Sequence, residues 1–228
     1  KEKGIIVCGT KSVGRPTAEL AWGLILGLAR NIPKEDANVK NGRWQSSVGM
    51  GLEGKTLGIA GLGNLGKRMA EIGTAFKMNI IAWSQNLTEK RCIEVGAKFV
   101  TKNQLMQQSD IITIHLILSD RSRGTFGERE LNLMKSSAYI INTSRGPIID
   151  EEALINVLEK KIIAGAGIDV FSIEPLPEKN SFISLKNILL TPHLGYVEKE
   201  NYFFYFKGYV DAVTAFLNGK PKNFISGY

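Results

Sequence analysis

The stretch TLGIAGLGNLG, residues 56–66, decides the fold of this 228-residue chain. Its first five residues form an apolar run, which predicts a buried parallel strand. Three glycines follow in the order Gly61-x-Gly63-x-x-Gly66, and the residues around and beyond them carry apolar side chains at a helical period. A strand, a glycine turn and a helix in this order are the context that a dinucleotide-binding fingerprint requires.

Each part of this turn has a physical role toward a pyrophosphate. Gly61 permits the tight turn, Gly63 lets the backbone approach the ligand, and Gly66 allows the helix to pack closely on the strand. The backbone N–H groups around Asn64 and Leu65, with the positive end of the helix dipole, would face the phosphates. The alternative is a glycine-rich turn that binds no ligand. The flanking strand and helix favour the cofactor-binding interpretation.

The composition is that of a globular protein and disfavours several other classes. The chain is 43% hydrophobic and 22% charged, and its longest apolar run, residues 20–29, is too short to cross a bilayer. The net charge of +7 comes from scattered lysines and arginines, which favours a solvated surface over a nucleic-acid patch. Such a charge suits a phosphorylated cofactor and an anionic substrate. Cys8 and Cys92 cannot form a disulfide framework, which predicts a reducing, cytoplasmic compartment.

Strands and helices alternate along the rest of the chain. Further strands are predicted at residues 4–7, 79–83, 98–100, 111–115, 139–142, 164–169 and 188–190. Helices are predicted at residues 16–31, 67–76, 88–95, a short stretch after Thr101, 150–160 and 198–217, with a polar connector at residues 32–47. This alternation predicts an α/β fold with a doubly wound parallel sheet. Ligands of such sheets bind outside the carboxyl ends of the strands.

Two charged or titratable side chains follow predicted strands at that edge. Arg145 comes after an apolar strand, and its guanidinium is suited to bidentate capture of a carboxylate. The alternative is a structural ion pair with an acidic neighbour. His193 follows the last strand and can exchange a proton with a substrate oxygen near neutral pH. The alternative is a hydrogen-bonded loop histidine.

Two further residues complete the candidate site. Glu174 lies in a loop before a proline, where its carboxylate could pair with His193 and fix the tautomer of the imidazole. The alternative is a solvated loop glutamate. His115 also ends a strand, and we expect it to line the cofactor site without taking part in the chemistry. The sequence has no cysteine or histidine cluster with metal-ligand spacing, so no metal is predicted.

Five motifs occur in a fixed order along the chain. They are PTAEL at residues 16–20, the glycine turn, NTSRG at residues 142–146, the stretch DVFSIEPL at residues 169–176, and TPHLG at residues 191–195. Together they closely resemble the NAD(P)-dependent D-isomer-specific 2-hydroxyacid dehydrogenase family, over nearly the whole chain. By that resemblance, Arg145 binds the substrate carboxylate and carbonyl, His193 is the acid/base, and Glu174 pairs with it. Asp169 would contact the nicotinamide amide, and Thr143 and Gly195 would also line the cofactor site.

The resemblance implies an oxidoreductase that transfers a hydride between NAD(P)(H) and a small 2-keto or 2-hydroxy acid, such as glyoxylate or hydroxypyruvate. The formate dehydrogenase branch is disfavoured, because it carries Gln in place of Glu174. A different class stays open, a cofactor-sensing binding protein similar to the C-terminal-binding corepressors, because those relatives keep similar residues. We also expect a homodimer through the helix at residues 16–30 and the connector that contains Trp44, which carry much apolar surface.

The chain departs from the family pattern in two ways. The family usually has an acidic residue after the second strand, whereas Ser84, Gln85 and Asn86 are neutral, so we expect NADPH to be used at least as well as NADH. The second departure is at the N-terminus. Residues 1–15 resemble the end of a substrate domain, residues 16–195 a dinucleotide-binding domain, and residues 196–228 a segment that returns to the substrate domain. We therefore expect a longer protein, of which these residues alone bind cofactor but turn substrate over feebly.

Overall fold

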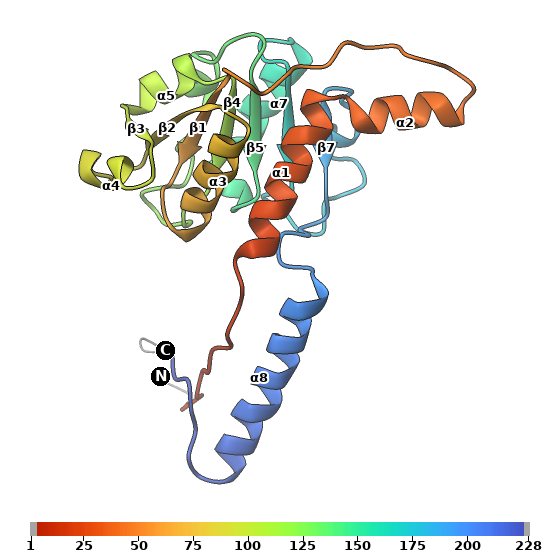
Figure 1. Cartoon of the computed structure of the whole chain (residues 1–228). Helices are drawn as coiled ribbons and strands as arrows, with labels where there is room; N and C mark the ends of the chain where they lie inside the picture. Colours follow the sequence, from red (N-terminus) through yellow and green to blue (C-terminus); the bar gives the residue numbers. More distant parts are fainter. Residues whose placement is uncertain (1–3, 226–228) are drawn as a thin grey trace. The chain divides into compact units, whose positions relative to one another are not determined.

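Seven parallel strands form one sheet, in the order β3-β2-β1-β4-β5-β6-β7, in the computed structural model, which describes residues 4–225 (Figure 1). The strands are β1 (Thr56–Ala60), β2 (Asn79–Trp83), β3 (Lys98–Phe99), β4 (Ile111–Ile114), β5 (Tyr139–Asn142), β6 (Gly165–Ile168) and β7 (Ile188–Leu190). The strand order reverses between β1 and β4, which is where a doubly wound sheet opens a crevice for a ligand. The predicted doubly wound parallel sheet is confirmed.

Helices cover both faces of this sheet (Figure 1). One face packs against α1 (Arg15–Ala29) and α3 (Asn64–Ala75), and the other against α5 (Lys102–Gln108), α6 (Glu128–Leu131) and α7 (Glu151–Glu159). The short α4 (Glu89–Ile93) contacts β3. Two 3₁₀ turns lie in loops. Gly146–Ile148 follows β5, and Ser181–Ser184 lies between β6 and β7. All four residues of β4 are buried, because both faces of the strand are covered.

The alternation of side chains along each strand divides the core into two clusters. On β4, Ile112 and Ile114 pack with the α5 and α7 side of the sheet, whereas Ile111 packs with the α1 and α3 side. On β1, Leu57 and Ile59 also belong to the α1 and α3 side. Because successive strand residues point to opposite faces, a parallel strand needs apolar residues at both. The sheet is therefore packed on both faces, and the loops that follow its strands are anchored to this core.

Two expectations for secondary structure are wrong. Residues 4–7 form no strand; the nearby chain makes only an isolated antiparallel bridge between Cys8 and Phe224. The predicted connector at residues 32–47 contains a helix, α2 (Ile32–Lys40). None of its residues is buried, so no apolar period reveals it. It is supported instead by a proline in its first turn and by an ion pair of 2.6 Å between Lys40 and Asp36.

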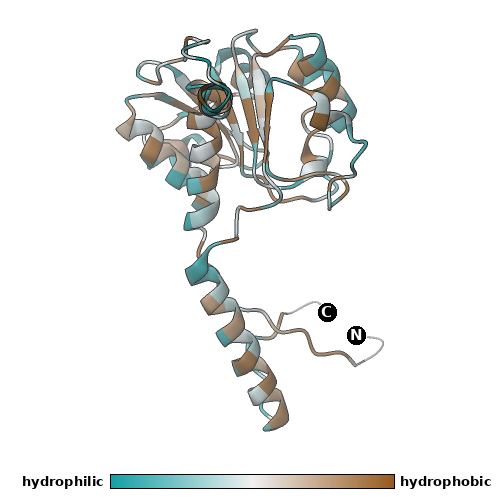
Figure 2. Ribbon diagram, turned by 90° about the vertical axis from the view of Figure 1, so that its right-hand side faces the viewer, coloured by the Kyte–Doolittle hydropathy of each residue, from teal (hydrophilic) through white to brown (hydrophobic). Residues whose placement is uncertain are grey.

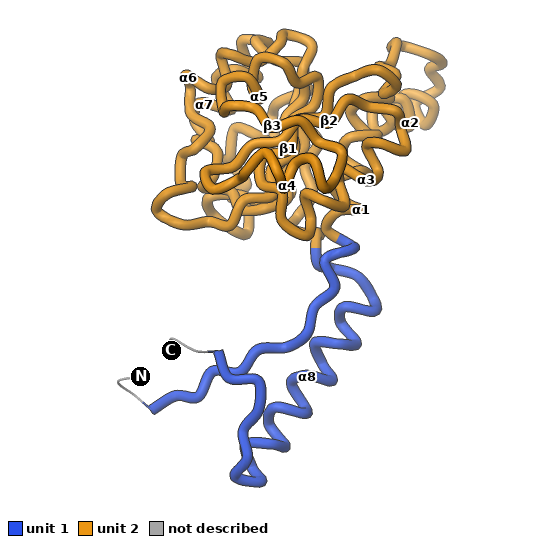
Figure 3. Tube along the Cα trace, turned by 60° about the vertical axis from the view of Figure 1, so that its left-hand side comes forward, with its two compact units in different colours: residues 1–16, 196–228 blue, residues 17–195 orange. Residues whose placement is uncertain are grey.

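The chain divides into two compact units, residues 17–195 and a smaller unit of residues up to 16 and from 196 onward (Figure 3). The smaller unit contains α8 (Lys199–Leu217), and Asn201 joins its two segments by accepting a hydrogen bond of 3.0 Å from the Val13 N–H. Large apolar side chains are exposed along α8, and Figure 2 colours several segments of this helix as hydrophobic. They include Phe203, Phe206, Val210, Val213 and Phe216. The interpretation of this unit as part of a substrate domain stays a prediction.

Within the described residues, the longest helices lack either the length or the continuous apolar character that a membrane-spanning segment needs. α8, the longest, combines its exposed aromatic residues with charged side chains such as Lys207 and Asp211.

Candidate active site

The glycine turn after β1 has the geometry that its sequence predicts. Gly61 has a φ of +100°, and a Cβ there would lie 2.6 Å from the carbonyl oxygen of His115. A Cβ on Gly66 would lie 2.1 Å from the carbonyl oxygen of Gly61, so the helix could not pack at this distance. At Gly63 a Cβ would meet no protein atom within 4 Å. The turn is thus closed toward the protein and open on the side where a ligand would approach.

The start of α3 is left open to a ligand. The helix begins at Asn64, three residues earlier than expected, so Asn64 and Leu65 both lie in its first turn. No side chain caps it, because its N-cap residue is Gly63. The first N–H groups of a helix have no acceptor within the helix, so without a cap they can donate hydrogen bonds to a ligand. The helix dipole favours an anion at this position. These residues fit the pyrophosphate of a dinucleotide.

Two buried polar atoms beside this region have no hydrogen-bond partner among the described residues. They are Oγ1 of Thr143, after β5, and Nδ1 of His115, after β4. Since unpaired buried polar atoms are costly, such atoms at the sheet edge fit a bound polar ligand. The other ring nitrogen of His115 lies 2.8 Å from Oγ1 of Thr113. Burial lowers the pKa of His115 to about 4, so the ring is neutral at physiological pH.

A close pair of side chains lies on the opposite half of the edge. Nδ1 of His193, after β7, lies 2.6 Å from Oε2 of Glu174, which belongs to the loop after β6. The other oxygen of Glu174 accepts a 2.8 Å hydrogen bond from the Phe171 N–H. Burial alone would raise the pKa of Glu174, but these two hydrogen bonds and the positive charge of Arg145 outweigh it and lower that pKa. The carboxylate therefore stays ionised beside the imidazole.

Asp169 holds the loop that carries His193. Its side chain is fully buried. Oδ1 accepts hydrogen bonds from the Thr191 hydroxyl at 2.6 Å and from the Leu194 N–H at 2.7 Å, and Oδ2 accepts one from the Gly195 N–H at 2.9 Å. These bonds surround His193, whose backbone has a φ of +54°. The predicted contact of Asp169 with a nicotinamide amide stays a prediction, and the role that its geometry supports is positioning.

The Arg145 loop is fixed against the Glu174 loop. The Asn142 side chain donates to the carbonyl of Arg145 and accepts from the Ser144 N–H, both at 3.0 Å. The Ser144 hydroxyl donates to the carbonyl of Leu116. A Cβ on Gly146 would lie 2.1 Å from the carbonyl carbon of Phe171, so the two loops touch through their backbones. The exposed guanidinium of Arg145 donates a 2.6 Å hydrogen bond to the carbonyl of Ser144, and its charge acts on Glu174 by lowering the pKa of that carboxyl.

Arg145, Glu174 and His193 therefore come together from the loops after β5, β6 and β7, which are neighbours in the sheet. The glycine turn, Ser84, Gln85 and His115 lie after β1, β2 and β4. Sequence reasoning gave no role to Thr17, whose hydroxyl donates a 2.7 Å hydrogen bond to the Gly195 carbonyl. Its place in the PTAEL motif is the only signal that could have found it. The described residues hold no cluster of three or more potential metal ligands.

Comparison with known proteins agrees with this geometry. The family described as "D-isomer specific 2-hydroxyacid dehydrogenase, NAD binding domain" matches residues 22–195. A glyoxylate reductase of Aeropyrum pernix is 39% identical over 98% of this chain and 70% of its own length. A glyoxylate reductase of Thermococcus litoralis is 42% identical over 85% of this chain and 61% of its own length.

A solved structure extends the agreement to three dimensions. The D-lactate dehydrogenase of Aquifex aeolicus, solved with NAD and lactic acid, superposes with a TM-score of 0.87 at 26% identity. The match covers 100% of this chain and 75% of that protein. One assignment follows from the glycine turn with its uncapped helix, from Arg145, Glu174 and His193 at the sheet edge, and from these matches. The chain belongs to the D-isomer specific 2-hydroxyacid dehydrogenase family.

Proposed function

We propose that the protein is an NAD(P)-dependent D-2-hydroxyacid dehydrogenase that reduces a small 2-keto acid, such as glyoxylate or hydroxypyruvate, or oxidises the corresponding D-2-hydroxy acid. The observation that carries the proposal is the His193–Glu174 pair beside Arg145. The names of the relatives support the enzyme over the alternative of a cofactor-sensing binding protein, because both curated relatives described above are reductases.

The bound dinucleotide supplies the hydride, and the residues of this chain supply position and charge. In this proposal the planar guanidinium of Arg145 binds the substrate carboxylate and polarises the neighbouring carbonyl. His193 transfers a proton from Nε2, because Glu174 holds Nδ1. The Glu174 carboxylate stabilises the protonated imidazole before the transfer. In the oxidative direction the same imidazole accepts the proton of the hydroxyl group.

The proposed cofactor site lies mainly on the other half of the edge, after β1, β2 and β4. We propose that Gly61, Gly63, Asn64 and Leu65 bind the pyrophosphate through their backbone, with His115, Thr143, Asp169 and Gly195 lining the rest of the site. Ser84 and Gln85 would lie beside the adenosine ribose. Since neither is acidic, a 2′-phosphate is not repelled, and we propose that NADPH is used at least as well as NADH.

We also propose a homodimer. The expected contribution of the helix at residues 16–30 is not supported, because α1 buries most of its apolar side chains in the core. The exposed apolar surface of this region lies instead on α2 and the following segment, where Trp44 is 76% exposed and Val48 is 97% exposed. Ile32 and Val39 of α2 add to the same surface. Light scattering that finds a monomer throughout the micromolar range would contradict this. The free thiols of Cys8 and Cys92 fit a reducing compartment, and we propose the cytoplasm.

A direct test combines turnover with binding. Glyoxylate, hydroxypyruvate and other small 2-keto acids are offered to the intact protein with NADPH or NADH, and oxidation of the dinucleotide is followed by absorbance. Cofactor affinity is measured separately by calorimetry. Turnover that is lost in His193→Gln supports the enzyme. Tight cofactor binding without turnover of any acid in the panel would instead favour the sensor.

A further inference from the structure

The loop after β2 lacks a charged group of either sign. Its residues Ser84, Gln85 and Asn86 stand where a doubly wound sheet meets the adenosine ribose of a dinucleotide. An acidic residue here would select NADH, and an arginine would accept the 2′-phosphate of NADPH. Neutral amides bind a phosphate more weakly than a guanidinium does, because charge-assisted hydrogen bonds are the stronger ones. The loop by itself therefore leaves cofactor choice open.

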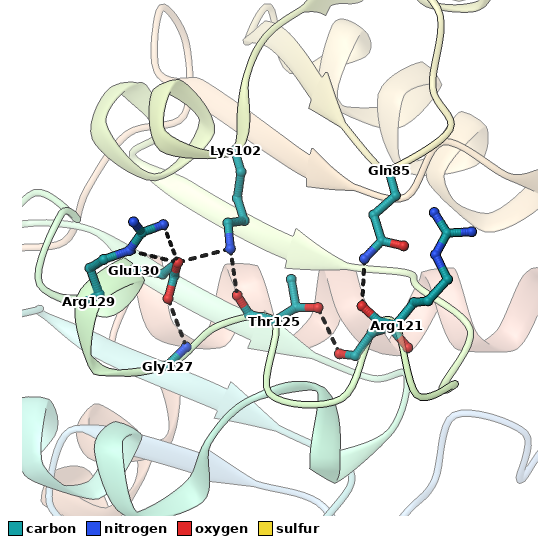
Figure 4. Close-up of polar contacts among 8 residues, drawn as sticks. Gln85, Lys102, Arg121, Thr125, Gly127, Arg129 and Glu130 are labelled. Carbon is teal, nitrogen blue, oxygen red and sulfur yellow. Dashed lines mark hydrogen bonds and ion pairs between the residues drawn. The ribbon is translucent and has the colours of Figure 1, made fainter.

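A cation reaches this loop from elsewhere in the chain. Nε2 of Gln85 donates a 2.5 Å hydrogen bond to the carbonyl oxygen of Arg121, and Nη2 of Arg121 donates one of 3.3 Å to Oδ1 of Asn86. Figure 4 shows the guanidinium of Arg121 beside the side chain of Gln85. Arg121 belongs to the loop after β4. Because β2 and β4 flank β1, their loops meet over the glycine turn.

The guanidinium of Arg121 is not neutralised by an acid. Within the described part of the chain, no carboxylate lies within ion-pair distance of it. The cluster beside it in Figure 4 is different, because Lys102 and Arg129 both contact Oε1 of the buried Glu130 at 2.9 Å. Those two cations share the carboxylate of Glu130, whereas Arg121 has no carboxylate partner among the described residues. Arg121 keeps its full charge, exposed to solvent and held only by a neutral amide.

We propose that Arg121 is the determinant of cofactor choice in this protein, binding the 2′-phosphate of NADPH together with Ser84 and Gln85. The inference rests on the proposed function, because it places the adenosine ribose at the end of β2. The bond between Gln85 and the backbone of Arg121 fixes the β4 loop against the β2 loop without using the guanidinium. The planar fork of the guanidinium can therefore turn from Asn86 to a phosphate, for which its geometry is matched.

The test separates the adenosine end from the rest of the site. Dissociation constants of the 228-residue chain are measured by calorimetry for NADPH, NADH, adenosine 2′,5′-bisphosphate and 5′-AMP. Arg121→Gln should weaken NADPH and the bisphosphate by about tenfold or more, the usual effect of losing a charged hydrogen bond. It should change NADH and 5′-AMP by less than about twofold, because neither has a 2′-phosphate. Arg121→Lys should recover part of the loss through its charge.

A neighbouring arginine provides a matched control. Arg123 is exposed, lies in the same loop and carries the same charge, but its side chain makes no hydrogen bond or ion pair with the described residues of the β2 loop. Arg123→Gln should leave the NADPH to NADH affinity ratio unchanged. An equal loss in Arg123→Gln, or an unchanged ratio in Arg121→Gln, overturns the inference. Wild-type protein that binds NADH but not the bisphosphate overturns this inference alone, and wild-type protein that binds neither dinucleotide overturns the proposed function as well.

Discussion

The two histidines of the chain end strands on opposite halves of the same sheet edge, and their surroundings give them opposite properties. His115 is hydrogen-bonded to the uncharged Thr113, and its burial lowers its pKa to about 4. His193 is about one-third exposed and lies 2.6 Å from the ionised Glu174. Of the two histidines, only His193 lies beside a carboxylate, which is the arrangement that the proposed proton transfer requires.

The same difference extends to the two halves of the edge. After β1, β2 and β4, the candidate ligands are backbone N–H groups and neutral side chains, with Arg121 as an exposed cation. After β5, β6 and β7, the side chains of Glu174 and His193 contact each other, and the buried Asp169 fixes the loop that carries His193. The first half is suited to binding a large anionic cofactor. The second half is suited to holding a small anion and moving a proton.

The strongest test of this difference is to replace each histidine in turn. His193→Gln should lower kcat by about 10²- to 10⁴-fold, the range that general acid–base groups contribute, and leave the dissociation constant of the cofactor nearly unchanged. His115→Gln should leave the pH profile of kcat in place, because the native ring is already neutral. Steady-state kinetics and calorimetry on both variants test this. Near-normal turnover in His193→Gln would mean that another group donates the proton.

The next largest effect is expected at Arg145. Arg145→Lys keeps the positive charge but loses the planar pair of donors, so we expect kcat/KM for the keto acid to fall by about 10- to 100-fold. Cofactor affinity should stay the same, because Arg145 lies on the half of the edge where we propose that the substrate binds. Kinetics with glyoxylate and hydroxypyruvate, beside a cofactor titration, measure both quantities. A comparable loss of cofactor affinity would mean that the two halves are not separate.

The sequence predicts β1, β2, β5 and β7 at their observed limits, because buried parallel strands are apolar runs between polar or glycine-rich turns. It also places Arg145, Glu174 and His193 together, since parallel strands end at one edge. It does not reveal α2, which buries none of its residues and so leaves no apolar period. Nor does it reveal Arg121 beside Asn86, because that contact depends on how two loops fold over β1 rather than on a spacing.

A smaller effect is expected from a charge placed on the cofactor half. Ser84→Asp adds a carboxylate beside the proposed 2′-phosphate position, where it would accept hydrogen bonds from the ribose hydroxyls and repel the phosphate. We expect the preference to shift toward NADH by about tenfold, which corresponds to roughly 1.4 kcal/mol. Turnover of the keto acid with saturating NADH serves as the control and should persist. A wild-type protein that already prefers NADH strongly would contradict the premise.

The smallest change concerns the charge of Glu174. Its pKa is lowered, so the carboxylate is ionised throughout the range in which the enzyme would work, and it lies 2.6 Å from Nδ1 of His193. Glu174→Gln keeps the size of the side chain but removes its charge, so kcat for keto-acid reduction should fall by less than about tenfold, while cofactor affinity stays the same. Steady-state kinetics and calorimetry measure both quantities, and an unchanged kcat would mean that the charge of Glu174 does not contribute to the reaction.

The lowered pKa of Glu174 also predicts how the stability of the folded protein depends on pH. A group whose pKa is lowered by folding stabilises the folded state above its ordinary value, and that contribution is lost as the pH falls through the lowered value. The wild-type protein should therefore be more stable than Glu174→Gln at neutral pH, and the difference in stability should disappear only in acid. The difference should be small, because the side chain of Glu174 is one-third exposed. Thermal unfolding of both proteins between neutral and acidic pH measures it. An equal difference between the two proteins at neutral and acidic pH would mean that the charge of Glu174 does not contribute to stability.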